Sequence, residues 1–325
     1  MKKFYIALFL ILIILAFLFP LSSKNNVKEI TLRKGETLSD LSRKLKEKGI
    51  IRSERLFKLL FRISSKDKKI KSGVYSFVFN EGEILTFLRL INQKPRPIEL
   101  EITIYEGMNS FQIAKLLEKK LGINYNKFLN LLSDSSFISK LSEKYEKLRN
   151  IKYLEGFLFP ETYKFFEGEK EEFIIERLVE TFFKKIEPFD SLFNKSKLNF
   201  YDVIKLASIV EKEAFYEDEK PIISSVFLNR LKINMPLQAN PTIAYILKVD
   251  SYWLGEEALN HNSPYNTYLY PGLPPTPICS PSLSSILSVL KPSNTKYLYF
   301  VADKNKRHLF AKTYLEHLQN IRKVR

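Results

Sequence analysis

Two stretches of the chain, residues 30–51 and 102–123, align with each other without a gap. Each begins with a short strand-like run, turns at Gly35 or Gly107, and continues with hydrophobic residues at helical spacing. The matching apolar positions are Leu41 and Leu45 in the first stretch and Ile113 and Leu117 in the second. The repeated strand, turn and amphipathic helix indicate an α+β fold.

Further elements are predicted between the repeats: helices over 52–64 and 81–92, and a strand over 73–79. The stiff, polar stretch Lys94-Pro95-Arg96-Pro97 is typical of a domain boundary. The expected divisions are a small α/β subdomain over 23–97, a connecting strand–helix segment over 98–150 and a larger mixed α+β domain over 151–325.

The chain begins with Met1-Lys2-Lys3, followed by an uncharged, apolar run from Phe4 to Leu21. As a helix this run would be roughly 27 Å long, close to the thickness of a bilayer core. It is long for the core of a signal peptide, and no small-x-small cleavage site follows it. We therefore expect residues 1–22 to form a cytoplasmic tip and a single-pass anchor in the cytoplasmic (inner) membrane, with the rest outside the cytoplasm.

Composition excludes several classes of protein. The formal net charge of +16 favours anionic partners, although a generally Lys-rich surface without a specific partner explains it equally well. No nucleic-acid-binding signature accompanies the charge, so we expect no nucleic-acid partner. A single cysteine, Cys279, and three widely separated histidines argue against a metal centre, and no Gly-x-Ser-x-Gly motif of a serine hydrolase is present.

Residues 200–214 form a helical pattern that carries two closely spaced glutamates. Apolar residues recur at helical spacing, and Glu211 and Glu213 border the two sides of the resulting stripe. A carboxyl group at the edge of an apolar surface loses hydration, which raises its pKa and suits it to act as a general acid. A solvated helix face is the commoner explanation of such a pattern. Geometry alone does not choose between the two glutamates.

Loops on either side of this helix are candidates for a binding cleft. Residues 153–163 combine Glu155 and Glu161 with four aromatic residues, whose faces can stack on sugar rings or can simply be buried in a core. Residues 235–242 are predicted to form a polar turn rich in amide side chains, and residues 263–275 form a long irregular segment that contains tyrosines. Such side chains suit neutral ligands rich in hydroxyl groups better than phosphates.

Seven motifs occur together and in order, which makes the combination specific. They are LEGFLFPETY (154–163), LASIVEKEA (206–214), VFLNRL (226–231), LQANPT (237–242), YNTY (265–268), GLPP (272–275) and YLYFVAD (297–303). With them, nearly the whole chain resembles the membrane-bound endolytic murein transglycosylases of the MltG (YceG-like) family. The first subdomain also resembles a LysM-like module, a small fold that often binds cell-wall glycan; a plain spacer between membrane and enzyme is the alternative.

The resemblance implies the roles of particular residues. It places the catalytic glutamate of the family at the first glutamate of IVEKE, Glu211, with Glu213 as the alternative acid. It implies that matching positions line the substrate cleft: Glu155, Glu161, Gln238, Asn240, Thr242, Tyr265 and Asn266. The chain departs from the family pattern at Thr276, at Cys279 and in the turn at 305–308, and these departures concern the C-terminal loop rather than the reaction.

The resemblance also implies the reaction, a cleavage between N-acetylmuramic acid and N-acetylglucosamine that uses no water and leaves a 1,6-anhydro end. A single carboxyl group can donate and then recover a proton, so no metal or cofactor is expected. The implied partners are peptidoglycan strands, the cytoplasmic membrane and peptidoglycan synthases, with nascent strands being terminated. The alternatives are a peptidoglycan-binding tether without catalysis and a hydrolytic muramidase that uses Glu211 with Glu155 or Glu161.

Overall fold

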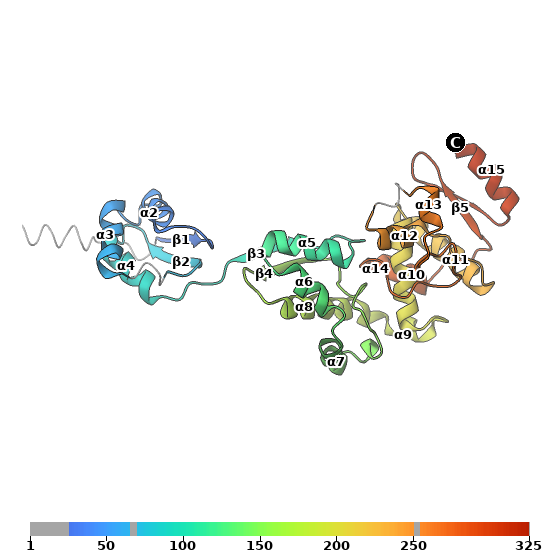
Figure 1. The fold of residues 1–325 in the computed structure, drawn as a ribbon, viewed down its shortest axis with the longest axis horizontal. Coiled ribbons are helices and arrows are strands. Elements are labelled where there is room, and N and C mark those ends of the chain that lie inside the picture. The colour runs from blue at the N-terminus through green and yellow to red at the C-terminus, as the bar shows by residue number, and fades with distance from the viewer. Residues whose placement is uncertain (1–25, 66–69, 250–253, 325) are drawn as a thin grey trace, which may run out of the picture. The chain divides into compact units, whose positions relative to one another are not determined.

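The computed structural model describes residues 26–65, 70–249 and 254–324, so the apolar run Phe4–Leu21 lies outside the described residues. The chain divides into two compact units, one up to Glu99 and one from Leu100 onward (Figure 1). None of the helices within the described ranges has the length and apolar character needed to cross a bilayer. Both units mix helices with two-stranded sheets, which confirms the predicted α+β class.

The first unit is built on one antiparallel strand pair covered by helices. Strand β1 (Val27–Leu32) pairs with β2 (Gly73–Val78) so that Val27 faces Val78 and Leu32 faces Gly73. Helices α2 (Leu38–Glu47) and α3 (Glu54–Ser64) lie between the strands in sequence, and α4 (Glu83–Asn92) follows. The unit has its own hydrophobic core, which includes Leu41, Leu45, Phe57 and Phe77. The helices and the strand predicted for this part of the chain are thereby confirmed.

The strand–turn–helix prediction for the two repeats is also confirmed. The second repeat forms β3 (Glu99–Thr103) and α5 (Ser110–Leu121), matching β1 and α2 of the first. Both helices begin with a capping box, Thr37 with Asp40 and Asn109 with Gln112, because their first backbone N–H groups need acceptors. The four matching apolar residues, Leu41, Leu45, Ile113 and Leu117, are all fully buried.

The second unit begins with a small sheet and a group of helices. Strand β3 pairs with β4 (Thr162–Phe166). Between these strands lie α6 (Tyr125–Leu131), α7 (Ser135–Lys144) and a 3-10 turn, η2 (Glu146–Leu148). The long α8 (Glu171–Ile186) follows, with η3 (Glu187–Phe189) and α9 (Asp190–Lys195).

The remaining elements surround a central buried helix, α10 (Phe200–Glu213), against which α11 and α14 pack (Figure 1). The elements after α10 are η4 (Glu217–Glu219), α11 (Lys220–Lys232), α12 (Asn240–Leu247), α13 (Glu256–Leu259), α14 (Leu283–Leu290), β5 (Tyr299–Ala302), β6 (His308–Ala311) and α15 (Tyr314–Val324). Strands β5 and β6 are antiparallel and carry α15 against them. No helix or strand interrupts residues 260–282, as expected for the long irregular segment.

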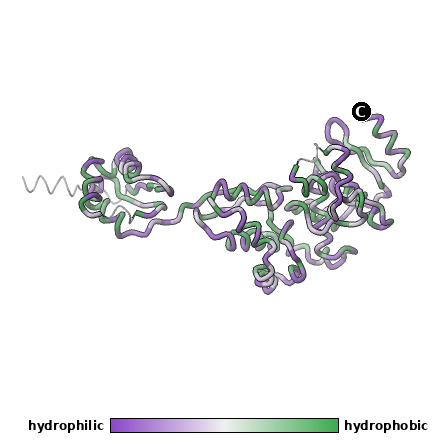
Figure 2. Tube along the Cα trace, in the orientation of Figure 1, coloured by the Kyte–Doolittle hydropathy of each residue, from purple (hydrophilic) through white to green (hydrophobic). Residues whose placement is uncertain are grey.

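One hydrophobic core connects the parts of the second unit. It contains Ile113 and Leu117 of α5, Leu178 of α8 and Val210 of α10. Its apolar residues, green in Figure 2, recur along many helices and are not gathered in a single segment. Because the core is continuous, the segment 98–150 packs together with residues 151–325 and holds its side chains at fixed positions beside α10.

Candidate active site

Helix α10 presents both glutamates at its C-terminal end. Val203, Leu206, Ala207 and Val210 of the predicted stripe have no exposed surface, and neighbouring positions of the helix are buried too. The helix ends at Glu213, where the chain reaches the surface. Because successive residues are rotated by about 100°, the side chains of residues 211 and 213 leave the helix in nearly opposite directions.

The carboxylate of Glu211 is held by donors at the start of α14. Its Oε2 accepts hydrogen bonds from the backbone N–H of Ser282 (2.9 Å) and from the hydroxyl groups of Ser282 and Ser285 (2.7 Å for Ser285). The buried Lys220 ammonium lies 3.6 Å from the same oxygen. The positive end of the α14 dipole adds to this attraction for an anion. Oε2 of Glu211 is thus surrounded by three hydrogen-bond donors and an ammonium group.

The sequence did not indicate that Ser282, Ser285 or Lys220 belongs to this environment. The serine-rich run before residue 283 does carry the signature of a helix start. No residue near that run indicates that its donors face Glu211, which precedes Ser282 by 71 residues. Only the packing of α10 on α14 brings these groups together.

Glu213 lies in a different environment. It is half-buried, and within the described residues its carboxyl group has neither a hydrogen bond nor an ion pair. Loss of hydration raises its pKa to about 7, while the charge of nearby Arg230 acts in the opposite direction. The guanidinium group of Arg230 donates hydrogen bonds to the backbone carbonyls of Leu298 (2.6 Å) and Leu237 (2.7 Å).

Two of the predicted cleft residues are linked to the surroundings of Glu213. Tyr268, whose pKa is raised by burial and further by the charge of Glu213, donates its hydroxyl proton to Asn240 Oδ1 at 2.6 Å. Arg230 Nη1 lies 3.4 Å from Gln238 Oε1. Gln238 and Asn240 are exposed, and Gln238 adopts a left-handed backbone with φ of 52°. A non-glycine residue in this conformation is uncommon and often lies at a functional site.

Three other predicted cleft residues fulfil structural roles. Thr242 is buried, and its hydroxyl donates to the carbonyl of Ala239 at 2.8 Å in the first turn of α12. Asn266 is buried and donates to the carbonyls of Leu259 and His261, both at 2.9 Å. Half-buried Tyr265 forms a hydroxyl–hydroxyl bond of 2.8 Å with Thr276. These contacts hold the loops at 237–242 and 263–276 in place.

The loop at 153–163 is mainly part of the core. Phe157, Leu158 and Phe159 are buried, so the structure agrees with the second of the two alternatives for these side chains, burial in the core. The reason is tertiary, since the loop packs beneath α8 and α10 around Phe182 and Phe200.

The two glutamates of this loop have different surroundings. Glu155 has no exposed surface and accepts hydrogen bonds from Ser110 Oγ (2.7 Å) and Tyr245 Oη (3.0 Å). Burial raises its pKa to about 7. Glu161 is exposed, and Lys185 Nζ, 2.5 Å from its carboxylate, lowers its pKa. Glu155 thus anchors the start of α5 and Glu161 lies at β4, and a part in substrate binding stays a prediction for both.

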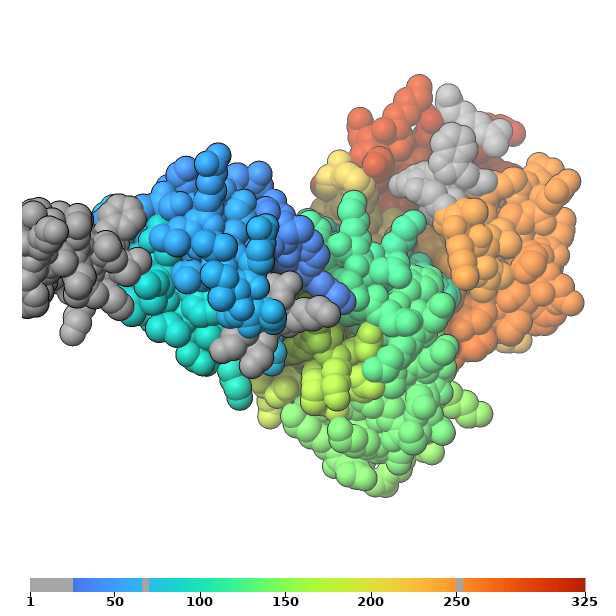
Figure 3. Space-filling model, turned by 60° about the vertical axis from the view of Figure 1, so that its left-hand side comes forward, coloured from blue at the N-terminus to red at the C-terminus, as the bar shows by residue number. Residues whose placement is uncertain are grey.

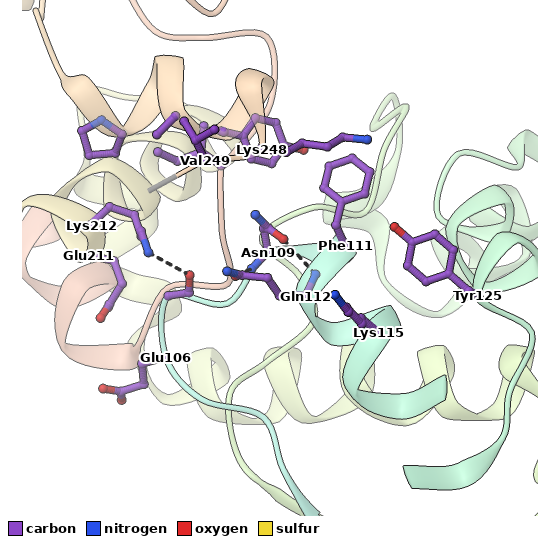
Figure 4. Close-up of a pocket in the computed structure, with 15 residues that line it drawn as sticks. Glu106, Asn109, Phe111, Gln112, Lys115, Tyr125, Glu211, Lys212, Lys248 and Val249 are labelled. Carbon is purple, nitrogen blue, oxygen red and sulfur yellow. Dashed lines mark hydrogen bonds between the residues drawn. The ribbon is translucent and has the colours of Figure 1, made fainter. Parts of the chain in front are cut away.

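A cleft of about 560 Å³ opens between the start of α5, the end of α10 and helix α12. Glu211 and Lys212 lie at one end, and Phe111, Gln112 and Tyr125 line the opposite wall (Figure 4). On the face shown in Figure 3, the surface of the α5 region (green) lies beside that of α12 and the following loop (orange). The cleft thus begins directly beside the helix end that carries both glutamates.

Comparisons with known proteins agree with one another. The model of the YceG-like family matches residues 30–323. The chain is 31% identical to an endolytic murein transglycosylase of Bacillus subtilis, covering 91% of this chain and 84% of the relative. A protein of the same name from Streptococcus pneumoniae is 30% identical, and the match covers 86% of this chain and 55% of that relative. A crystal structure of a yceG-like protein from Listeria monocytogenes is similar with a TM-score of 0.64 at 29% identity, covering 91% of this chain and 99% of that one.

Proposed function

Because this chain belongs to the YceG-like family, we propose that it is an endolytic murein transglycosylase that cleaves peptidoglycan glycan strands at internal positions. The names of the relatives support the reaction class, and the matches to these relatives extend over most of this chain. Gln238 and Asn240, which are linked through Arg230 and Tyr268 to the surroundings of Glu213, support the location of the site.

We propose Glu213, the alternative acid of the sequence analysis, as the proton donor in preference to Glu211. The observation that carries this choice is the contrast between their partners. Oε2 of Glu211 accepts three hydrogen bonds and lies 3.6 Å from the Lys220 ammonium. Within the described residues Glu213 has lost hydration without gaining a hydrogen bond, and burial raises its pKa to about 7. A general acid needs a pKa near the working pH.

In the proposed reaction Glu213 donates its proton to the glycosidic oxygen as the bond from C1 of the muramic acid residue to that oxygen breaks. The C6 hydroxyl of the same sugar then attacks C1, and its proton passes to the Glu213 carboxylate. The product is a 1,6-anhydro ring, and the acid is restored without consuming water. One carboxyl group suffices because the nucleophile belongs to the substrate.

The neighbours of Glu213 suit substrate orientation. Gln238 and Asn240 present amide groups at the surface, where they can bind sugar hydroxyl or acetamido groups. Arg230 limits how far the pKa of Glu213 rises. A hydrolytic muramidase would need a second carboxylate across the cleft, and the positions of Glu155 and Glu161 do not favour that alternative.

Product analysis tests this assignment. Purified glycan strands treated with the wild type should yield 1,6-anhydro ends, which mass spectrometry distinguishes from hydrolysis products by the missing water. Glu213→Gln should abolish product formation by more than about a thousandfold with the fold intact, since the amide cannot transfer a proton. Glu211→Gln is the matched control and should keep measurable activity. Full activity of Glu213→Gln would refute the assignment, and loss in Glu211→Gln alone would return the role to Glu211.

We further propose the cellular setting that the sequence indicates. The run Phe4–Leu21 anchors the chain in the cytoplasmic membrane as a single span, with the catalytic unit outside the cytoplasm. The first unit, whose strand–helix–helix–strand order is compatible with a LysM-like module, holds glycan near the membrane. There the enzyme would terminate nascent strands beside peptidoglycan synthases. Fractionation of cells and protease accessibility of the catalytic unit test the orientation.

A further inference from the structure

The cleft between α5, α10 and α12 is larger than the proton transfer by Glu213 requires. Its volume of about 560 Å³ is in the range of pockets that enclose a whole ligand. Glu213 does not line it, whereas the adjacent Lys212 does. The cleft therefore extends away from the proposed acid on the Glu211 side of the helix.

Lysine ammonium groups dominate the charge of this cleft. Lys115 comes from α5, Lys212 from α10 and Lys248 from the end of α12. Within the described part of the chain Lys115 has no ion pair, Lys212 is 3.4 Å from the Gly107 carbonyl, and Lys248 lies 4.4 Å from the centre of the Phe111 ring. None of the three is neutralised by a carboxylate contact in the structure.

The acidic groups of the cleft do not offset these lysines. Glu211 is already compensated by Lys220 and by the serine donors of α14. Burial raises the pKa of Glu106, and the charge of Glu211 raises it further, so Glu106 carries its negative charge less readily than a surface glutamate. A ligand with carboxylate groups would meet a net positive surface here.

The neutral groups indicate what kind of anion fits. Asn109, Gln112 and Tyr125 offer amide and hydroxyl groups, and Phe111 offers an apolar face (Figure 4). A phosphate bound at the start of a helix uses the free backbone N–H groups there. Those of Asn109, Ser110 and Gln112 are already bound to side-chain acceptors of Gln112, Glu155 and Asn109. Carboxylates joined by amide bonds and small apolar groups suit this surface better.

We propose that the cleft binds the acidic peptide of a muramic acid residue in the same glycan strand, at a distance from the bond that Glu213 cleaves. This inference rests on the proposed function, and it makes the enzyme selective for glycan strands that carry peptides. Lys115 and Lys248 bind peptide carboxylates, Asn109 and Gln112 bind peptide amide groups, and Phe111 contacts apolar side chains.

Initial rates on two preparations of the same strands test the selectivity. One preparation keeps its peptides, and the other has lost them to an amidase. In the double variant Lys115→Gln, Lys248→Gln, the ratio of the rate on peptide-bearing strands to that on stripped strands should fall roughly tenfold. The matched control is Lys119→Gln, Lys120→Gln, which removes the same charge from exposed positions of α5 and should keep the wild-type ratio. An unchanged ratio in the first variant overturns the proposal.

Binding provides a measurement that does not depend on cleavage. The full chain carrying Glu213→Gln is titrated with a synthetic, sugar-free peptide that has two free carboxylates. Saturable binding is expected, weakened roughly tenfold by the Lys115 and Lys248 changes and by raised salt. Competition by inorganic phosphate as effective as that by the peptide would overturn the proposal, because the cleft would then be a general anion site.

The two proposals fail in different ways. If the wild type cleaves strands but treats peptide-bearing and stripped strands alike, the peptide subsite is refuted and the transglycosylase stands. If it cleaves neither preparation but binds the peptide through Lys115 and Lys248, the proposed reaction is refuted and the subsite stands. Absence of peptide binding refutes the subsite in either case.

Discussion

Glu211 and Glu213 are separated by one residue, yet their surroundings differ. The carboxylate of Glu211 accepts hydrogen bonds from Ser282 and Ser285, whereas loss of hydration raises the pKa of Glu213. A carboxyl group that must give up and recover a proton should not be held by fixed donors. The immediate surroundings of the two residues therefore decide which glutamate suits general acid catalysis.

The pH dependence of the rate follows from the protonation state of Glu213. Burial raises its pKa to about 7, and the proposed reaction needs the protonated form, so the rate should fall as the pH rises through about 7. Initial rates over a buffer series with one strand preparation measure this limb. If the rate instead decreases with rising pH at values below pH 5, the role of Glu213 is contradicted, because the decrease would then belong to a carboxyl group of ordinary pKa.

The stability of variants separates the structural glutamate from the catalytic one. Glu211→Ala removes the acceptor of three hydrogen bonds and one partner of the buried Lys220, and should lower the free energy of unfolding by about 3 kcal/mol. Glu213→Gln should change it by less than about 1 kcal/mol, since no hydrogen bond is lost. Urea unfolding of the two variants measures the difference. Equal losses would mean that Glu211 does not anchor α14.

At the scale of elements, the loop at 153–161 packs in the core between helices. Glu155 ties it to the start of α5 and, through Tyr245, to α12. The next residue, Gly156, has φ of 87° and lies close to the loop around Pro277. This loop therefore fixes the distance between two walls of the cleft without lining it.

Glycine substitutions test this close approach. A Cβ at Gly156 would lie 2.6 Å from Pro277 Cβ, so Gly156→Ala should destabilise the second unit by more than about 2 kcal/mol. Gly122→Ala is the matched control, because Gly122 also has a positive φ (70°) but no atom near its Cβ position. That variant should lose only about 1 kcal/mol. Thermal unfolding compares them, and similar losses would show that contact with Pro277 is unimportant.

At the scale of the whole molecule, each compact unit contains its own hydrophobic core. Leu45→Ala creates a cavity in the first core and should lower one calorimetric transition, with a loss of about 2–5 kcal/mol. Leu178→Ala is the counterpart in the second core and should lower the other transition. A single transition that shifts equally in both variants would show that the units unfold together.

Most helices and strands were predictable because their signals are local. The capping residues Thr37 and Asn109 and the apolar spacing of Leu41, Leu45, Ile113 and Leu117 indicate both repeats correctly. The site was less predictable. Glu155 and Asn266 are polar residues in irregular segments and Thr242 is a polar residue at the start of α12, positions typical of binding residues, but their polar atoms satisfy buried partners in the fold.

The amino-acid sequence alone determined the secondary structure, the two-glutamate helix end and the family resemblance, because all three depend on neighbouring residues and motif order. Only the tertiary structure decided what surrounds each carboxyl group. Donors from α14 and Lys220 reach Glu211, whereas Glu213 lies near Arg230 and has no hydrogen bond to any residue that the structure describes. The pKa of a carboxyl group depends on hydration and on partners distant in the chain, and helix packing brings those partners into place.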